Sequence, residues 1–137
     1  MATHKKIALV TGGSRGLGKD MALNIAKKGL DVILTYNTQK DEALAVVAKI
    51  EKTGQKAAAL QLNTGVVKNF DAFINQLKET LKKLDNAGGL DFLVNNAGVG
   101  THAEFVDTTE EQFDALVNIH FKGAYFLTQK TLPLLND

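Results

Sequence analysis

The sequence predicts an α/β protein in which helices cover both faces of a parallel sheet, a doubly wound arrangement. Four short apolar runs alternate along the chain with segments whose apolar residues recur at helical spacing. The first run, Ile7–Val10, is apolar throughout instead of alternating, which is typical of a strand covered on both faces. A glycine-rich loop joins this run to the first helical segment. We therefore expect four strands and four helices.

Boundary signals support the first elements. The first helix has apolar residues at Leu17, Met21 and Ile25 on its expected inner face. It ends at two lysines followed by Gly29, because cations in the last turn and a glycine beyond it favour a helix stop. Gly54 ends the second helix in the same way. The expected strands are 7–10, 32–36, 57–62 and 90–95, and the second helix is expected over 41–53.

Apolar stripes predict two later helices. Thr108 and Glu111 have the spacing of a capping box and predict the start of the last helix, whereas Pro133 predicts its end. The stripe of the third helix consists of Phe70, Phe73, Ile74, Leu77, Leu81 and Leu84. The stripe of the last helix consists of Phe113, Leu116, Val117, His120, Phe121, Ala124 and Leu127.

Composition limits the possible classes of protein. The chain has 137 residues, 45% of them hydrophobic and 23% charged, which is typical of one globular domain. Sixteen basic and fifteen acidic residues leave a net charge of +1, so we expect no nucleic-acid or membrane-surface partner. No apolar run approaches the roughly 20 residues that span a bilayer. With no cysteine and no signal peptide at the start, we expect a cytoplasmic protein.

The loop from Thr11 to Gly18 is the first candidate binding site. Glycines let the backbone turn tightly, and the free N–H groups at the start of the following helix favour a phosphate or pyrophosphate. The segment from Gly13 to Lys19 also fits most of the P-loop pattern. That pattern requires Ser or Thr as the next residue to hold Mg²⁺, and the chain has Asp20 there. We therefore expect a phosphate site without a metal.

Two motifs together resemble those of the short-chain dehydrogenase/reductase family. The first is Thr11 followed by glycines at Gly-x-x-x-Gly-x-Gly spacing, and the second is Asn95-Asn96-Ala97-Gly98 at the end of the fourth expected strand. The resemblance extends from Ile7 to Pro133. Within the family, the chain is similar to the 3-oxoacyl-acyl-carrier-protein reductases. It implies a Rossmann-type fold over 1–137 and an oxidoreductase that moves a hydride between a nicotinamide and a carbonyl or alcohol substrate.

The resemblance also implies the cofactor contacts. Glycines of the loop would form the turn under the pyrophosphate, and residues after the third and fourth strands would line the adenine and its ribose. Asn63 stands where the family usually has Asp, and its amide can both accept and donate. The implied cofactor-binding residues are Gly12, Ser14, Arg15, Gly16, the backbone of Leu17, Gly18, Tyr36, Asn37, Thr38, Leu62, Asn63, Asn95, Ala97 and Gly98.

The end of the second strand favours NADP(H) over NAD(H). An acidic residue there would bind the ribose 2′-hydroxyl of NAD and repel the 2′-phosphate of NADP. The sequence reads Thr35-Tyr36-Asn37-Thr38, with no acid before Asp41. Arg15 resembles the arginine that NADP-preferring members direct at the phosphate. A charge-assisted hydrogen bond of about 1.5–3 kcal/mol is sufficient to set the preference.

The last helix departs from the family pattern. Aligning Phe121-Lys122-Gly123 places His120, not Asn118, at the position of the family's catalytic asparagine. His120 would either take part in proton transfer, where its ring adds a titratable group, or be a hydrogen-bonded packing residue.

The family's serine, tyrosine and lysine would lie beyond Asp137, so we expect the chain alone to be inactive. The resemblance implies a homotetramer or homodimer of the complete protein. A non-catalytic dinucleotide-binding or regulatory module remains the alternative.

Overall fold

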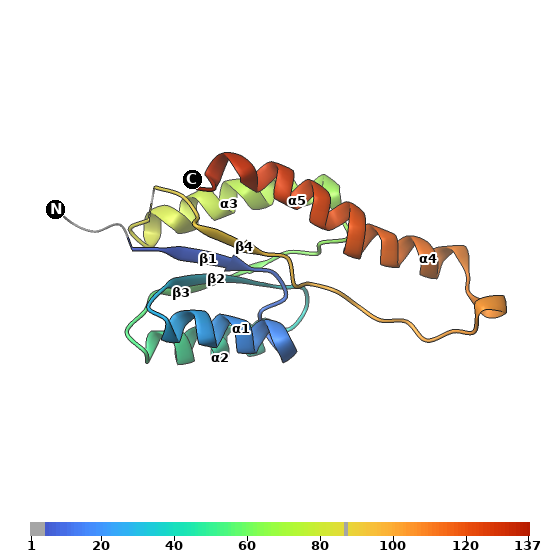
Figure 1. Ribbon diagram of the computed structural model, residues 1–137, viewed down its shortest axis with the longest axis horizontal. Coiled ribbons are helices and arrows are strands. Elements are labelled where there is room, and N and C mark those ends of the chain that lie inside the picture. Colours follow the sequence, from blue (N-terminus) through green and yellow to red (C-terminus); the bar gives the residue numbers. More distant parts are fainter. Residues whose placement is uncertain (1–4, 87) are drawn as a thin grey trace.

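The computed structural model describes residues 5–86 and 88–137 and shows one four-stranded parallel sheet (Figure 1). The strands are β1 (Ile7–Val10), β2 (Asp31–Tyr36), β3 (Ala57–Gln61) and β4 (Phe92–Val94), in the order β3-β2-β1-β4. The predicted fold class is confirmed. Strand β4 is shorter than the expected 90–95, because Leu90 instead makes an isolated parallel bridge with Leu135.

The central strand is fully covered. Leu9 of β1 pairs with Ile33 of β2 on one side and with Leu93 of β4 on the other. Every residue of β1 is buried with no exposed surface, as the uninterrupted apolar run predicts. Because all strands are parallel, their carboxyl ends lie along one edge of the sheet, which is where such folds bind ligands.

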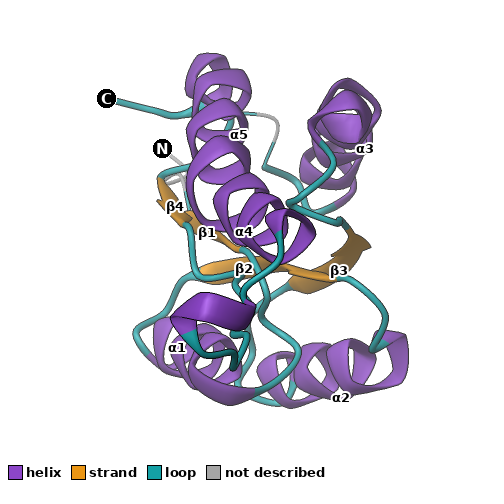
Figure 2. Cartoon of the chain, turned by 90° about the vertical axis from the view of Figure 1, so that its right-hand side faces the viewer, coloured by secondary structure: helices purple, strands orange, loops and turns teal. Residues whose placement is uncertain are grey.

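Helices cover the two faces of the sheet in pairs (Figures 1 and 2). Helices α1 (Gly16–Lys27) and α2 (Lys40–Glu51) lie on one face, and α3 (Phe70–Lys83) and α5 (Ala124–Thr131) on the other. Each face has its own hydrophobic core. Five of the six residues in the predicted stripe of α3 are buried, and Leu84 packs against them, which confirms that prediction.

The buried face of α1 differs from the prediction. Leu17 is 75% exposed and Ile25 is only partly buried against the core, whereas the buried residues of the helix are Gly18, Ala22 and Ala26. A Cβ on Gly18 would overlap the carbonyl oxygen of Gly12, so α1 packs closely against the loop at this point. The small residues are buried because the close approach of helix and sheet leaves no room for larger ones.

The capping box also lies one residue later than predicted. Helix α4 (Glu110–Val117) is capped by Thr109, whose Oγ1 accepts from the amide of Gln112, while Gln112 Oε1 accepts from the amide of Thr109. The predicted cap, Thr108, instead donates its hydroxyl to the carbonyl of Glu104. Both threonines precede a residue that can complete the box, so spacing alone could not choose between them.

The predicted last helix is one continuous rod of three parts. A π-helical segment, Asn118–Gly123, joins α4 to α5, and a short 3₁₀ turn containing Pro133 follows α5 as expected. Helix α4 extends beyond the sheet (Figure 1). Much of the apolar stripe therefore stays exposed, at 61% for Phe113 and 73% for Phe121, because no described element packs on it.

Two further features of the fold concern the edge of the sheet and the character of the helices. Strand β4 is an edge of the sheet, and Phe92 on it is 46% exposed, as an unpaired parallel edge predicts. Among the described helices, none has both the length and the apolar character needed to cross a lipid bilayer.

Candidate functional site

A cleft of about 400 Å³ opens at the carboxyl ends of the strands, where the glycine loop meets the ends of β2, β3 and β4. It collects residues that lie far apart in the sequence. Thirteen of the fourteen predicted cofactor-binding residues line it, and Asn95 does not. The lining residues are Gly12, Ser14, Arg15, Gly16, Leu17, Gly18, Thr35, Tyr36, Asn37, Thr38, Gln39, Leu62, Asn63, Thr64, Asn96, Ala97, Gly98, Val99 and Ile119.

The glycine loop forms the floor of this cleft. Gly12 and Gly16 have φ values of 66° and 58°, in the left-handed region that strongly favours glycine. A Cβ on Gly12 would lie 2.9 Å from Cα of Ala97, so the loop also needs a residue without a side chain to approach the end of β4. The spacing of the glycines thus reflects two requirements, a backbone turn and close packing.

Helix α1 begins at the cleft with free backbone donors. Its N-cap, Arg15, is extended, and no side chain caps the helix. In the described chain, the amides of residues 16–18 have no hydrogen-bond partner. Gly16, Leu17 and Gly18 all line the cleft, so these donors and the positive end of the helix dipole are available to an anionic ligand. Lys19, the lysine of the alternative P-loop pattern, is not part of the lining.

Buried hydroxyls hold the glycine loop onto the strands. Thr35 Oγ1 accepts from the amide of Gly12 at 3.1 Å, and its carbonyl accepts from the amide of Gly13 at 2.9 Å. Thr11 Oγ1 accepts from the amides of Asn96 and Ala97 at 3.0 and 2.9 Å. These contacts tie the loop to β2 and to the segment after β4, so the floor of the cleft is fixed from both sides.

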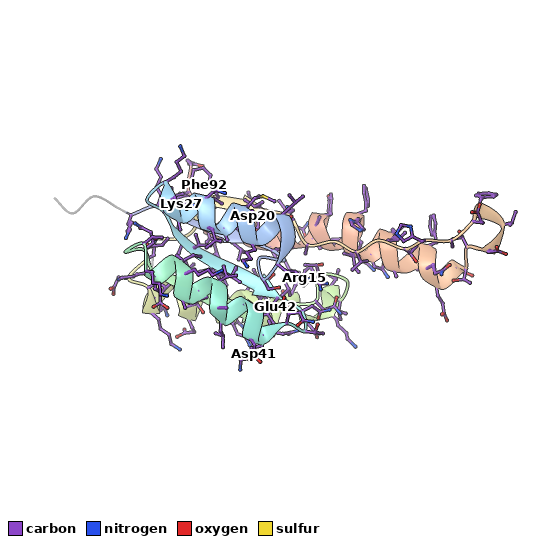
Figure 3. The ribbon with its side chains drawn as sticks, turned by 90° about the horizontal axis from the view of Figure 1, so that it is seen from below. Arg15, Asp20, Lys27, Asp41, Glu42 and Phe92 are labelled. Carbon is purple, nitrogen blue, oxygen red and sulfur yellow. The ribbon has the colours of Figure 1, made fainter. Side chains whose placement is uncertain are left out.

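The charge of the cleft is carried by one side chain. Arg15 is the only charged residue among the described residues that line it. Asp41 and Glu42, the nearest acids after β2, begin α2 but are not part of the lining. Figure 3 shows Arg15 at the start of α1 and these two acids at the start of α2, with Lys27 at the far end of α1. The cleft therefore carries a positive charge and no carboxylate.

Asn63 is already partly engaged. Its Oδ1 accepts from the amide of Gly65 at 2.9 Å and so stabilises the turn after β3. In the described part of the chain, its Nδ2 makes no hydrogen bond. Where an aspartate would offer a second acceptor at this position, Asn63 offers a donor to whatever occupies the cleft.

The two asparagines after β4 have different roles. Asn95 Nδ2 donates to Thr128 Oγ1 on α5 at 3.0 Å, so this side chain fastens α5 to the sheet. Asn96 Nδ2 donates to the carbonyls of Thr11 and Gly12, at 3.1 Å each, and thereby supports the glycine loop. Asn95 therefore does not line the cleft, because its amide is directed at α5, and its predicted contact with the cofactor stays a prediction.

His120, the candidate catalytic group, lies beside the cleft and not in its lining. Its Nε2 is 2.6 Å from the carbonyl oxygen and 3.2 Å from the amide nitrogen of Val99. The ring also covers Gly98, where a Cβ would lie 2.5 Å from His120 Cε1. A second groove, lined by His120 and mainly apolar residues that include Leu116 and Phe121, shares Val99 with the cleft.

Several cleft residues were not predicted. Thr35 and Asn96 stand inside the motifs that located the site, but sequence alone does not show which member of each motif points inward. Ile119 reaches the cleft from the π-helical segment, which periodicity at 3.6 residues per turn does not predict. The remaining unpredicted lining residues are Gln39, Thr64 and Val99.

A parallel sheet ordered β3-β2-β1-β4, with a glycine loop that leads from β1 into α1, defines a Rossmann-type α/β protein. Comparison with known families gives the more specific assignment. The family model described as short chain dehydrogenase matches residues 6–137. The chain belongs to the short chain dehydrogenase family.

Curated relatives agree with this assignment. The chain is 35% identical over 125 residues to tetrahydroxynaphthalene reductase of Pyricularia oryzae, covering 91% of this chain and 42% of that protein. It is 36% identical over 129 residues to a 3-oxoacyl-acyl-carrier-protein reductase of Staphylococcus epidermidis, covering 93% and 50%. The chain thus spans about half the length, or less, of these curated relatives.

Solved structures are similar over the same half. A short chain dehydrogenase from Burkholderia cenocepacia, solved in complex with NADP, has a TM-score of 0.86 and 36% identity, covering 96% of this chain and 51% of that one. A blue fluorescent protein from a metagenomic library, solved in complex with NADPH, has a TM-score of 0.85 and 29% identity, covering 96% and 52%.

Proposed function

We propose that the chain forms the cofactor-binding half of an NADP(H)-dependent oxidoreductase that transfers a hydride between the nicotinamide and a carbonyl or alcohol substrate. One observation carries the choice of cofactor: Arg15 is the only charged residue among the described residues of the cleft. The cleft offers the 2′-phosphate of NADP a cation and no repelling carboxylate. It also lacks the acidic residue that would bind the ribose 2′-hydroxyl of NAD.

Backbone geometry supports the binding of the pyrophosphate. The unpaired amides of residues 16–18 at the start of α1 are available to bind the pyrophosphate. Gly12 and Gly16, both in the left-handed region, leave room for it because they have no side chain. Leu62 and Asn63 would contact the adenine, and Tyr36, Asn37 and Thr38 would surround its ribose. The relatives with NADP and NADPH in their structures are consistent with this assignment.

Titration calorimetry with NADPH and NADH tests the cofactor choice directly. The wild-type protein should bind NADPH about tenfold to a hundredfold more tightly than NADH, the range of one charge-assisted hydrogen bond. Arg15→Ala should remove that preference while leaving NADH affinity unchanged. Lys27→Ala is the matched control, because it removes a cation from the far end of the same helix.

Two outcomes would contradict the proposal. Equal affinity of the wild type for both coenzymes would refute the preference for NADP(H). Failure of folded protein to bind either coenzyme would refute the function, since the cleft would then serve another ligand.

We further propose that the complete protein is a homotetramer or homodimer. The exposed apolar residues on α4, the π-helical segment and α5 support an interface there, because so many large apolar side chains on one rod are unusual for a free surface. Light scattering on the purified protein measures this, and a monomer would contradict it. The cytoplasmic location and the single domain over 1–137 stay predictions.

A further inference from the structure

We infer that His120 is a positioning residue that holds the segment 98–103 against the helical rod and thereby sets one wall of the cofactor cleft. This inference rests on the proposed function only for its effect on NADPH binding. The contact itself stands on geometry, because His120 Nε2 lies 2.6 Å from the carbonyl oxygen of Val99. At that separation one of the two atoms must carry the proton, so the imidazole Nε2–H donates to the carbonyl.

The segment 98–103 depends on His120 for its hydrogen bonding. Within the described part of the chain, the hydrogen bond from His120 to the carbonyl of Val99 is the only one that residues 98–103 make. The amide of Val99 lies 3.2 Å from the same Nε2, which cannot accept while it carries the proton. The segment belongs to no helix or strand, and it begins the long connection that runs from β4 out to α4 (Figure 1). Gly98 and Val99 nevertheless line the cleft, so the position of a cleft wall depends on this one side chain.

The π-helical segment places His120 where it can do this. Three of its residues meet the two loops that border the cleft: Ile119 contacts Gly65, His120 covers Gly98, and Gly123 lies against the carbonyl of Thr64. Each contact uses a glycine, since a Cβ on Gly65, Gly98 or Gly123 would overlap its partner. The rod is therefore fitted to the loops after β3 and β4, and His120 supplies the hydrogen bond within that fit.

Three substitutions separate the hydrogen bond from the bulk of the ring. In His120→Gln the side-chain amide nitrogen can occupy the place of Nε2 and donate to Val99. In His120→Asn the amide lies near the place of Nδ1 and is too short to reach. His120→Leu removes the donor but keeps a side chain of similar bulk, and it should fold because His120 is exposed.

The first measurement needs no cofactor. Backbone ¹⁵N order parameters of Gly98, Val99 and Gly100 should be those of a rigid backbone, near 0.85, in the wild type and in His120→Gln. They should fall toward the flexible range, below about 0.6, in His120→Asn and His120→Leu. Unchanged order parameters in His120→Leu would overturn the inference whatever NADPH does.

The second measurement is the NADPH dissociation constant of the same four proteins. Loss of one net hydrogen bond should raise it about threefold to tenfold in His120→Asn and His120→Leu, and His120→Gln should restore the wild-type value. Lower order parameters with unchanged NADPH affinity would overturn the role in binding, as would failure of glutamine to rescue. If the wild type bound no NADPH, the proposed function would fail. The order parameters would still show whether His120 holds the segment 98–103 in place.

Discussion

Thr11 and Asn96 form two hydrogen bonds with each other, although Thr11 follows β1 and Asn96 follows β4. The backbone amide of Asn96 donates to Thr11 Oγ1 at 3.0 Å, and Asn96 Nδ2 donates to the carbonyl of Thr11 at 3.1 Å. Thr11 is 1% exposed, so this pair joins the ends of β1 and β4 away from water. It fixes the glycine loop relative to the Asn-Asn-Ala-Gly motif, and both border the cleft.

Thr11→Val should lower the free energy of unfolding by about 2–3 kcal/mol. Valine keeps the shape but leaves the amides of Asn96 and Ala97 without their acceptor, and a buried donor without a partner costs about 1–3 kcal/mol. Urea denaturation measures the change. Thr11→Ser retains the hydroxyl and should lose less than half as much, so an equal loss in both variants would contradict the hydrogen-bond explanation.

Gly18→Ala should weaken NADPH binding at least tenfold. The added Cβ would overlap the carbonyl of Gly12 and the side-chain amide of Asn96, so α1 must move away from the loop that we propose binds the pyrophosphate. Calorimetry measures the affinity. Gly100→Ala is the control, because a Cβ there meets nothing within 4 Å, and its binding should match the wild type.

Asp31→Ala should destabilise the fold by about 2–3 kcal/mol, mainly because the amide of Lys56 loses its acceptor. The Asp31 side chain is 2% exposed, and its Oδ1 also lies 3.2 Å from Nζ of Lys5. Asp31→Asn keeps an acceptor for the amide, and Lys5→Ala removes only a half-exposed cation, so each should cost about 1 kcal/mol or less. Thermal unfolding of the three variants ranks them, and a Lys5→Ala effect as large as that of Asp31→Ala would contradict this order.

Asp85 should make stability depend on pH in the acid range. A hydrogen bond from Lys56 and its charge lower the pKa of Asp85 from 3.8. Because the folded state holds the carboxylate more strongly than the unfolded state, the contribution is present above pH 3.8 and is lost as the pH falls through the lower native value. The stability advantage of the wild type over Asp85→Asn should therefore disappear in strong acid. Unfolding curves at pH 6 and in strong acid test this, and a constant difference between the proteins would argue against it.

Local patterns predicted most of the fold because each is set by a short-range cause. The uninterrupted apolar run of β1 reflects burial on both faces, and the stripe of α3 reflects a helix with one buried side. Where two local signals competed, the sequence could not decide. Thr108 and Thr109 both precede a suitable partner, and only the path of the chain from 104 to 110 makes Thr109 the cap.

The inner face of α1 shows why hydrophobicity can mislead. Leu17 looks like a core residue, yet it is exposed at the mouth of the cleft, and Gly18 with two alanines packs on the sheet. Close approach selects small residues there, and closeness is a property of two elements and not of one. The same applies to Asn95 and Asn96, which are neighbours in the motif but bond to opposite layers.

By itself the sequence determined the class of fold, the glycine turn at Gly12 and Gly16, and the absence of an acid after β2, since each depends on residues close together in the chain. Only the tertiary structure decided which side chains face the cleft and what His120 contacts. Those depend on how the π-helical segment meets the loops after β3 and β4, where the residues in contact lie 21 or more positions apart in sequence. Contacts over such separations are fixed by packing of the whole chain, and a local pattern does not show which distant residue each side chain will meet.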